Sequence, residues 1–358
     1  MRMAASIDEA ALAEVERSFR DLAATGRTAA LVVRHDDDVL LDLACGVDAD
    51  GQPFTTSTPV FLYSAVKPVA ALAVLIAVAD GALPLDAPIA ELWPAFAAHG
   101  KDRVTVRQAL AHGAAVPGWR EQLDLDTFAD REAASELLAA STPWWMPGEP
   151  GEHAVSYGHL LDAILRHGTG RDIEQWWQQI ADVGIGVRLT PGSGSERPWA
   201  LRDDDGAWQR QWASAPGLMG VCLGNPPGLL DVTVVNGPAG RGLVAPAVTG
   251  YGHAHDLAQL WSWWTGRGGA DRLGSELRRV SVDPVLQGYD HVLDREVRWG
   301  LGPQIDDDGV GMGGVGGTYG AQLQRPGLAV GFTTADLSPP GHADVLDAAL
   351  DRLAAGGA

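Results

Sequence analysis

One apolar run in the first quarter of the chain limits what it can fold into. The segment VFLYSAVKPVAALAVLIAVADG spans residues 60–81, and its first twenty residues contain a single charge, Lys67. About 20 apolar residues can cross a bilayer, but a lysine inside such a span costs about 2.5–3.5 kcal/mol, and Pro68 breaks a helix. The uninterrupted stretch 68–79 has only twelve residues. It therefore predicts the central helix of a soluble domain, apolar on all sides because it is covered on all sides.

Composition limits the partners. The 358 residues include 26 lysines and arginines against 46 aspartates and glutamates, a formal net charge of −20. Such a surface repels phosphate groups, so neither nucleic acid nor membrane is an expected partner. The two cysteines, Cys45 and Cys222, exclude a disulfide framework and argue against a zinc site. We expect no metal and no cofactor. Residues 1–26 lack the apolar core of a signal peptide, which predicts a cytoplasmic protein.

Strand signals lie near both ends of the chain and helix signals lie between them. The first 26 residues predict an amphipathic helix that begins with a capping box from Ser6 to Glu9. Residues 29–48 predict a hairpin around an aspartate turn, and residues 318–336 predict a second hairpin that turns at 325–327. A helix is expected to close the chain over 342–356.

The simplest arrangement of these elements is one antiparallel sheet built from both ends of the chain and flanked by helices. We therefore predict an α/β (α+β) fold over residues 1–358 as a single unit. Its α/β lobe comprises about 1–80 and 231–358. A mainly helical lobe of about 81–230 is inserted between these segments.

Ser64 and Lys67 are the strongest candidates for chemistry. Residues three apart lie on one face of a helix, so the serine hydroxyl and the lysine amine can meet. A serine becomes nucleophilic when a neighbour takes its proton, and burial in an apolar wall favours the neutral, basic form of a lysine. The helix N-terminus also favours negative charge as it develops. The spacing alone is short enough to arise by chance.

The surrounding motifs resemble the serine β-lactamase and penicillin-binding-protein superfamily, in its class C β-lactamase and family VIII esterase branch. S-x-x-K-P occupies 64–68 and L-x-L-D-x-P occupies 83–88. The segments 104–119, 143–171 and 309–323 are similar to later blocks of that family, in the same order. The resemblance implies a β-lactamase/transpeptidase-like fold, with Ser64 as the acylated nucleophile and Lys67 as its base or proton relay.

The same resemblance implies roles for a glycine-rich strand. Met312, Gly313 and Gly314 occupy the place of the K-T-G, H-x-G or W-G-G triplet, and the amides of Val315 and Ser64 would form the oxyanion hole. Because glycine has no side chain, a substrate can lie directly against such a strand. Met312 departs from the pattern because it supplies no cation for a carboxylate. This argues against β-lactam substrates and favours an apolar ester or thioester.

The second motif of the family can be aligned in two ways. In one alignment the catalytic tyrosine is Tyr157, followed by His159 in place of the usual asparagine. In the other, Glu152 holds the tyrosine position and Tyr157 is a packing residue. The familiar chemistry slightly favours Tyr157. His153 and His159 are predicted to contact the substrate in this region.

Two other groups of residues favour structural roles. His253, His255 and Asp256 have loose metal-like spacing but stand at a predicted helix start, where a helix cap is the more probable role. The tryptophans at 176, 177, 261, 263 and 264 predict core packing. Others of the thirteen tryptophans are candidates for the wall of an apolar acyl pocket.

The sequence as a whole predicts a serine hydrolase or acyltransferase that acts through an acyl-Ser64 intermediate. Its substrate is expected to be a small ester, amide or carrier-bound acyl group, with a place in specialised metabolism. Two rivals remain open: a cyclase or isomerase that uses Glu152 and the histidines without acylation, and a ligand-binding protein without catalysis. The intact Ser64 and Lys67 favour the enzyme, and the altered second and third motifs favour the rivals.

Overall fold

An antiparallel sheet of eight strands organises the chain. The computed structural model describes residues 7–48, 50–181, 184–191, 198–267, 271–323, 327–337 and 344–355. Within these residues the strand order is β2-β1-β10-β9-β8-β7-β6-β5, and every neighbouring pair is antiparallel. The strands are β1 (Ala29–His35), β2 (Asp38–Cys45), β5 (Leu286–Asp290), β6 (Arg295–Trp299), β7 (Gln304–Asp306), β8 (Gly309–Gly313), β9 (Tyr319–Leu323) and β10 (Leu328–Thr334). Two short strands, β3 (Val60–Phe61) and β4 (Tyr251–Gly252), pair separately.

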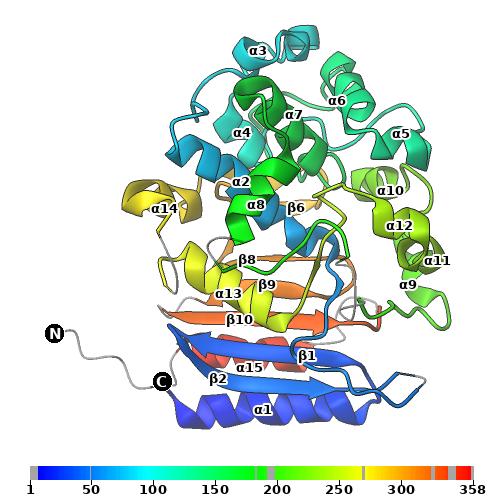
Figure 1. The fold of residues 1–358 in the computed structure, drawn as a ribbon, viewed down its shortest axis with the longest axis vertical. Coiled ribbons are helices and arrows are strands. Elements are labelled where there is room, and N and C mark those ends of the chain that lie inside the picture. The colour runs from blue at the N-terminus through cyan, green and yellow to red at the C-terminus, as the bar shows by residue number, and fades with distance from the viewer. Residues whose placement is uncertain are drawn as a thin grey trace.

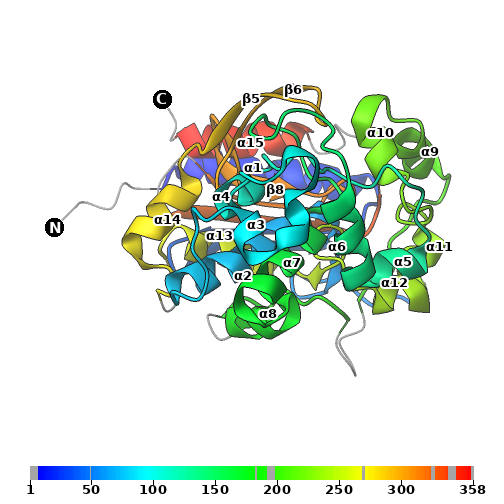
Figure 2. The same ribbon diagram turned by 90° about the horizontal axis from the view of Figure 1, so that it is seen from above.

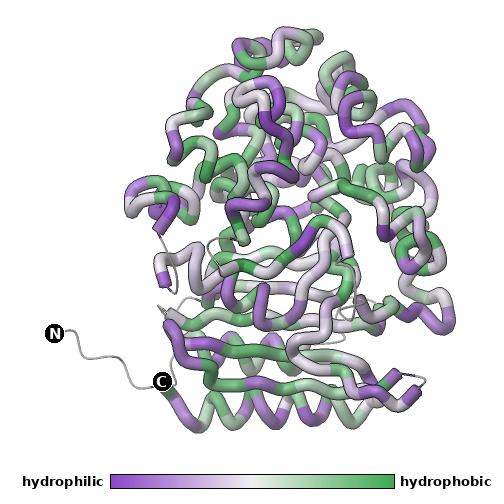
Figure 3. Tube along the Cα trace, in the orientation of Figure 1, coloured by the Kyte–Doolittle hydropathy of each residue, from purple (hydrophilic) through white to green (hydrophobic). Residues whose placement is uncertain are grey.

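Helices cover both faces of the sheet (Figure 1). The two helices from the ends of the chain, α1 (Glu9–Ala24) and α15 (Asp344–Ala355), pack on one face, against side chains such as Leu31 and Phe332. Figure 3 shows hydrophobic and hydrophilic residues alternating along α1, as expected for a helix with one covered side. On the other face, α13 (Ala254–Trp264) crosses β1, β9 and β10.

The long apolar run forms the helix between the sheet and the helical region. A short 3-10 turn, η1 (Tyr63–Val66), leads into α2 (Lys67–Ala79), in which every residue from Lys67 to Ala77 is buried. The remaining helical elements are α3 (Ile89–Leu92), η2 (Pro94–Gly100), α4 (Val106–Leu110), α5 (Leu125–Ala129), α6 (Arg131–Ala140), α7 (Tyr157–Thr169), α8 (Ile173–Ala181), α9 (Ala207–Ala213), α10 (Gly217–Leu223), α11 (Val232–Asn236), α12 (Pro238–Gly242) and α14 (Gly274–Val282).

The expected fold class is confirmed, and one local prediction is wrong. Both predicted hairpins and the closing helix are present, although residues 325 and 326 of the turn expected at 325–327 lie outside the described residues. Helix α1 begins at Glu9, and its N-cap is Asp8, whose carboxylate accepts hydrogen bonds from the amides of Ala10 and Ala11. Glu9 is therefore the first residue of the helix and not the third, as a capping box from Ser6 requires; Ser6 itself lies outside the described residues. No helix among the described residues is long and apolar enough to cross a bilayer.

Candidate active site

Ser64 stands at a sharp entry into the central helix. Tyr63, directly before it, has a φ of 48°, in the left-handed region that a tyrosine seldom adopts. The Tyr63 ring is buried against Phe61 and Trp208, at centroid distances of 4.7 and 5.5 Å. Backbone strain of this kind persists where packing holds it, and it is common at functional sites. The turn leaves Ser64 lining a pocket of about 380 Å³.

Lys67 is fully buried, and its amine contacts the serine. The Nζ–Oγ distance to Ser64 is 2.6 Å, and Nζ also donates to the carbonyls of Ala154 (2.9 Å) and Ala247 (3.1 Å). Gly158 makes the contact with Ala247 possible, because a Cβ on Gly158 would lie 2.7 Å from the backbone of Pro246. Burial lowers the pKa of Lys67, and the neighbouring Glu152 carboxylate opposes that shift.

Glu152 is the second ionisable group that the structure brings to Lys67. Its Oε1 lies 3.1 Å from Lys67 Nζ, and its side chain is only 8% exposed. The Glu152 amide donates to the carboxylate of Asp290 (3.1 Å), which holds the backbone at this position. Ser64, Lys67 and Glu152 therefore form one contiguous group, and both Ser64 and Glu152 line the pocket.

Tyr157, His153 and His159 do not line the pocket. Tyr157 is fully buried at the start of α7, and its hydroxyl donates to the carbonyl of Leu110 (2.8 Å). His153 Nε2 accepts from the amide of Val116, and His159 Nε2 lies 2.8 Å from the carbonyl of Phe128. This geometry is that of three core side chains. All three side chains are fully buried, and none of them is among the residues that line the pocket of Ser64.

Strand β8 and the residues after it form the wall opposite Glu152. Met312, Gly313, Gly314 and Val315 all line the pocket. A Cβ on Gly314 would lie 2.5 Å from the carbonyl oxygen of Leu62 and 3.2 Å from the amide nitrogen of Ser64, so only glycine allows this approach. The sequence placed this strand beside the nucleophile, and the structure brings the two segments into contact.

The remaining pocket walls include residues that the sequence analysis did not single out. Trp212 and Met219 come from α9 and α10, and Trp299 and Arg295 come from β6. Asp290 supports this wall from outside the pocket: it is fully buried, and its carboxylate accepts from the indole of Trp299 (3.0 Å). The alternation of residues along β6, which puts Arg295, Val297 and Trp299 on one face, could have indicated that Arg295 and Trp299 act together. No local sequence pattern indicates the role of Asp290.

The residues predicted to have structural roles have them. His253 is the N-cap of α13 and forms a capping box with Asp256. The tryptophans of α8 and α13 are buried in the core: Trp176, Trp177, Trp261, Trp263 and Trp264.

The model of the beta-lactamase family matches residues 15–355. The chain belongs to this family. Two curated proteins are similar over part of their length. Esterase/beta-lactamase LipL of Mycobacterium tuberculosis is 33% identical over 146 residues, 40% of this chain and 34% of that protein. Esterase EstB of Burkholderia gladioli is 28% identical over 209 residues, 51% of this chain and 52% of that protein. The matches thus span between about a third and a half of these relatives.

Solved structures of the same fold match nearly the whole chain. A family VIII carboxylesterase superposes with a TM-score of 0.82 at 24% identity, covering 97% of this chain and 99% of that one. A penicillin-binding-protein homologue from Caulobacter crescentus superposes with a TM-score of 0.77 at 25% identity, covering 95% and 97%. The expected membership of the serine β-lactamase and penicillin-binding-protein superfamily is confirmed.

Proposed function

We propose that this beta-lactamase family member is a serine hydrolase that cleaves small carboxylic esters through an acyl-Ser64 intermediate. The observation that carries the proposal is the 2.6 Å contact between Ser64 Oγ and Lys67 Nζ in a pocket with apolar walls. Both curated relatives are named as esterases, which supports the same reaction class. Met312 places no cation on β8, next to the nucleophile, and Arg295 of the pocket lining lies two strands away on β6, which supports an ester over a β-lactam.

The hydrogen bonds of Lys67 leave one position on its nitrogen for the reacting proton. The carbonyls of Ala154 and Ala247 can only accept, so two N–H bonds point to them. Ser64 Oγ and Glu152 Oε1, at 2.6 and 3.1 Å, share what remains. In the neutral amine this position is a lone pair that accepts the serine proton. In the ammonium it is a third N–H that donates to Glu152.

Acylation then follows in balanced steps. Ser64 Oγ forms a bond to the ester carbonyl carbon while its proton passes to Lys67, and the alcohol leaves with a proton returned from Lys67. Water then forms a bond to the acyl carbon while one of its protons passes to the Lys67–Glu152 pair. The bond from the acyl carbon to Ser64 Oγ breaks, this proton returns to Oγ, and the carboxylic acid leaves. A positioned general base of this kind typically contributes 10²–10⁴ in rate.

Two backbone amides are the proposed oxyanion hole. The carbonyl of Gly314 accepts from the amide of Gly317 (2.9 Å), and a trans peptide directs the Val315 N–H to the opposite side. Gly314 itself lies against the amide of Ser64. Donors aimed at the developing oxyanion stabilise the transition state, and the loss of one typically costs 10²–10³ in rate.

A serine-directed phosphonate probe tests the proposal. Intact-mass spectrometry should show one phosphonyl group on the wild-type protein and none on Ser64→Ala, while Lys67→Ala should react 10²–10⁴ times more slowly. Wild-type protein should also release nitrophenol from short-chain nitrophenyl esters. Equal labelling of wild type and folded Ser64→Ala would exclude Ser64 as the nucleophile and favour catalysis without acylation or ligand binding alone.

A further inference from the structure

A cationic side chain of β6, the exposed Arg295, lines the Ser64 pocket. Successive residues of a strand point to opposite faces. Arg295, Val297 and Trp299 therefore share one face of β6, and both Arg295 and Trp299 line the pocket. Glu296 and Arg298 point to the other face, where Arg298 forms an ion pair with Asp307 (2.6 Å). The guanidinium of Arg295 thus belongs to the pocket side of the sheet.

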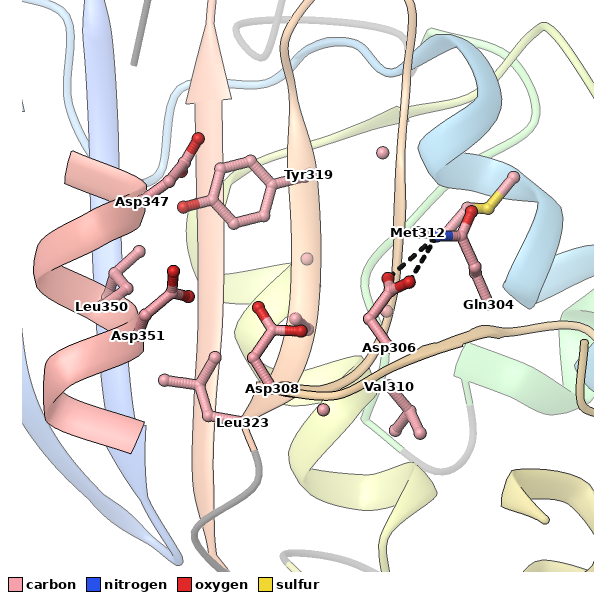
Figure 4. Close-up of a pocket in the computed structure, with 15 residues that line it drawn as sticks. Gln304, Asp306, Asp308, Val310, Met312, Tyr319, Leu323, Asp347, Leu350 and Asp351 are labelled. Carbon is pink, nitrogen blue, oxygen red and sulfur yellow. Dashed lines mark hydrogen bonds between the residues drawn. The ribbon is translucent and has the colours of Figure 1, made fainter. Parts of the chain in front are cut away.

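Arg295 is positioned by a neutral group and not by a carboxylate. Its guanidinium donates to Gln304 Oε1 (3.0 Å). Gln304 Nε2 in turn donates to both carboxylate oxygens of Asp306, at 2.9 and 2.8 Å, as Figure 4 shows. Asp306 therefore orients the amide of Gln304 so that its oxygen faces Arg295. No carboxylate in the described part of the chain lies within ion-pair distance of this guanidinium.

The rest of the pocket lacks a second unpaired charge. Glu152 is the other ionisable side chain of the pocket lining, and it is paired with Lys67. The remaining side chains there are mostly apolar, among them Trp212, Leu223 and Leu293. An arginine whose fork is held by one glutamine retains N–H donors for a planar, bidentate partner such as a carboxylate. Arg295 thus places a positive charge at the pocket of a protein whose formal net charge is −20.

We propose that Arg295 binds a carboxylate on the ester substrate, so that the enzyme selects esters that carry an acidic group at some distance from the reacting carbonyl. The inference rests on the proposed esterase function. Strands β8, β7 and β6 are neighbours in the sheet, and strands lie about 4.8 Å apart, so β6 is roughly 10 Å from β8. The acidic group is therefore separated by several bonds from a carbonyl placed beside Ser64 and Gly313.

Matched ester pairs test the inference. Mono-nitrophenyl adipate and nitrophenyl hexanoate have acyl chains of equal length and differ in the terminal carboxylate. 5-Acetoxy-2-nitrobenzoate and nitrophenyl acetate place the same difference on the leaving group. Arg295→Gln should lower kcat/KM for the acidic member of one pair by about 10-fold or more, mainly through KM, because a charge-assisted hydrogen bond is lost. Its kcat/KM for the neutral member should stay within about twofold of wild type.

Arg298→Gln is the matched control, because it removes the same charge from the opposite face of the same strand. It should leave the ratio of acidic to neutral esters unchanged. An equal fall of this ratio in both variants would assign the effect to the general electrostatic field and overturn the inference. So would an unchanged ratio for both ester pairs in Arg295→Gln. Absence of any ester hydrolysis by wild type would instead refute the proposed function itself.

Discussion

Lys67 is the residue on which the proposed chemistry depends. A fully buried ammonium is costly unless it is paired, and burial alone would favour the neutral amine. The Glu152 carboxylate, 3.1 Å away, favours the ammonium instead. Burial has the larger effect, so the pKa of Lys67 lies below its ordinary value, which favours the neutral amine that can accept the serine proton. Tyr157 cannot take part in this balance without moving, because its hydroxyl is held by Leu110 and burial raises its pKa far above the ordinary value.

We therefore predict opposite consequences for substitutions at the two aligned positions. Glu152→Gln should lower nitrophenyl-ester turnover at least about 100-fold, because the general-base relay is lost. Tyr157→Phe should change turnover by less than about fivefold but should lower the free energy of unfolding by about 1–3 kcal/mol, because the buried carbonyl of Leu110 loses its partner. Steady-state kinetics and urea unfolding of both variants check this. The reverse kinetic pattern would return the role to Tyr157.

At the scale of elements, residues of the β5–β6 hairpin hold part of the pocket wall in place. Figure 2 shows β5 and β6 next to each other at one side of the molecule, and β5 is an edge strand of the sheet. Asp290, the last residue of β5, accepts hydrogen bonds through Oδ1 from the amides of Glu152, Val292 and Leu293, and through Oδ2 from the indole of Trp299. Three of these four donors belong to pocket-lining residues. One buried carboxylate thus positions much of the wall.

Substitution of Asp290 should reveal this shared support. Asp290→Asn keeps an oxygen for the three amides but turns an NH₂ toward the Trp299 N–H, so it should cost about 1–3 kcal/mol of unfolding free energy. Trp299→Phe removes the opposing donor, so Asp290→Asn should cost clearly less in that background. Asp290→Ala, which leaves three amides without an acceptor, should cost the most. A double-mutant cycle by urea unfolding measures the coupling, and strictly additive costs would contradict the arrangement.

The hairpins differ in how far the sequence could predict them. β1–β2 and β9–β10 combine β-rich runs with a local turn, so periodicity was sufficient to place them. β8 is three-fifths glycine and forms only because β7 and β9 flank it. In the site, Ser64 and Lys67 were predictable because they are one helical turn apart. Glu152 and Asp290 are 138 residues apart in the sequence, so their contact has no local signature.

At the scale of the whole molecule, three histidines are buried without charge around the pocket and within the helical region. His112 Nδ1 accepts from the His153 amide (3.1 Å), and the His112 ring stacks on Tyr157 and lies 4.2 Å from the ring of the pocket-lining Trp299. His159 lies between Trp119 and Phe128. Burial lowers the pKa of all three, to about 3 for His153 and about 4 for His159. The fold therefore favours the neutral form of each imidazole.

Acid should therefore begin to destabilise the fold near pH 6.5, before the carboxylates titrate. His159 has a folded-state pKa of about 4 against an ordinary value of 6.5. The unfolded chain consequently binds the additional proton between these values, and stability falls as pH decreases through this window. One histidine contributes up to about 1.4 kcal/mol per pH unit there. His159→Gln keeps a donor for the carbonyl of Phe128 but cannot titrate. Urea unfolding measured between pH 7 and 4.5 should therefore give a plot of unfolding free energy against pH whose slope is smaller than that of wild type, by the equivalent of close to one proton. Identical slopes for the two proteins would contradict a neutral, buried His159.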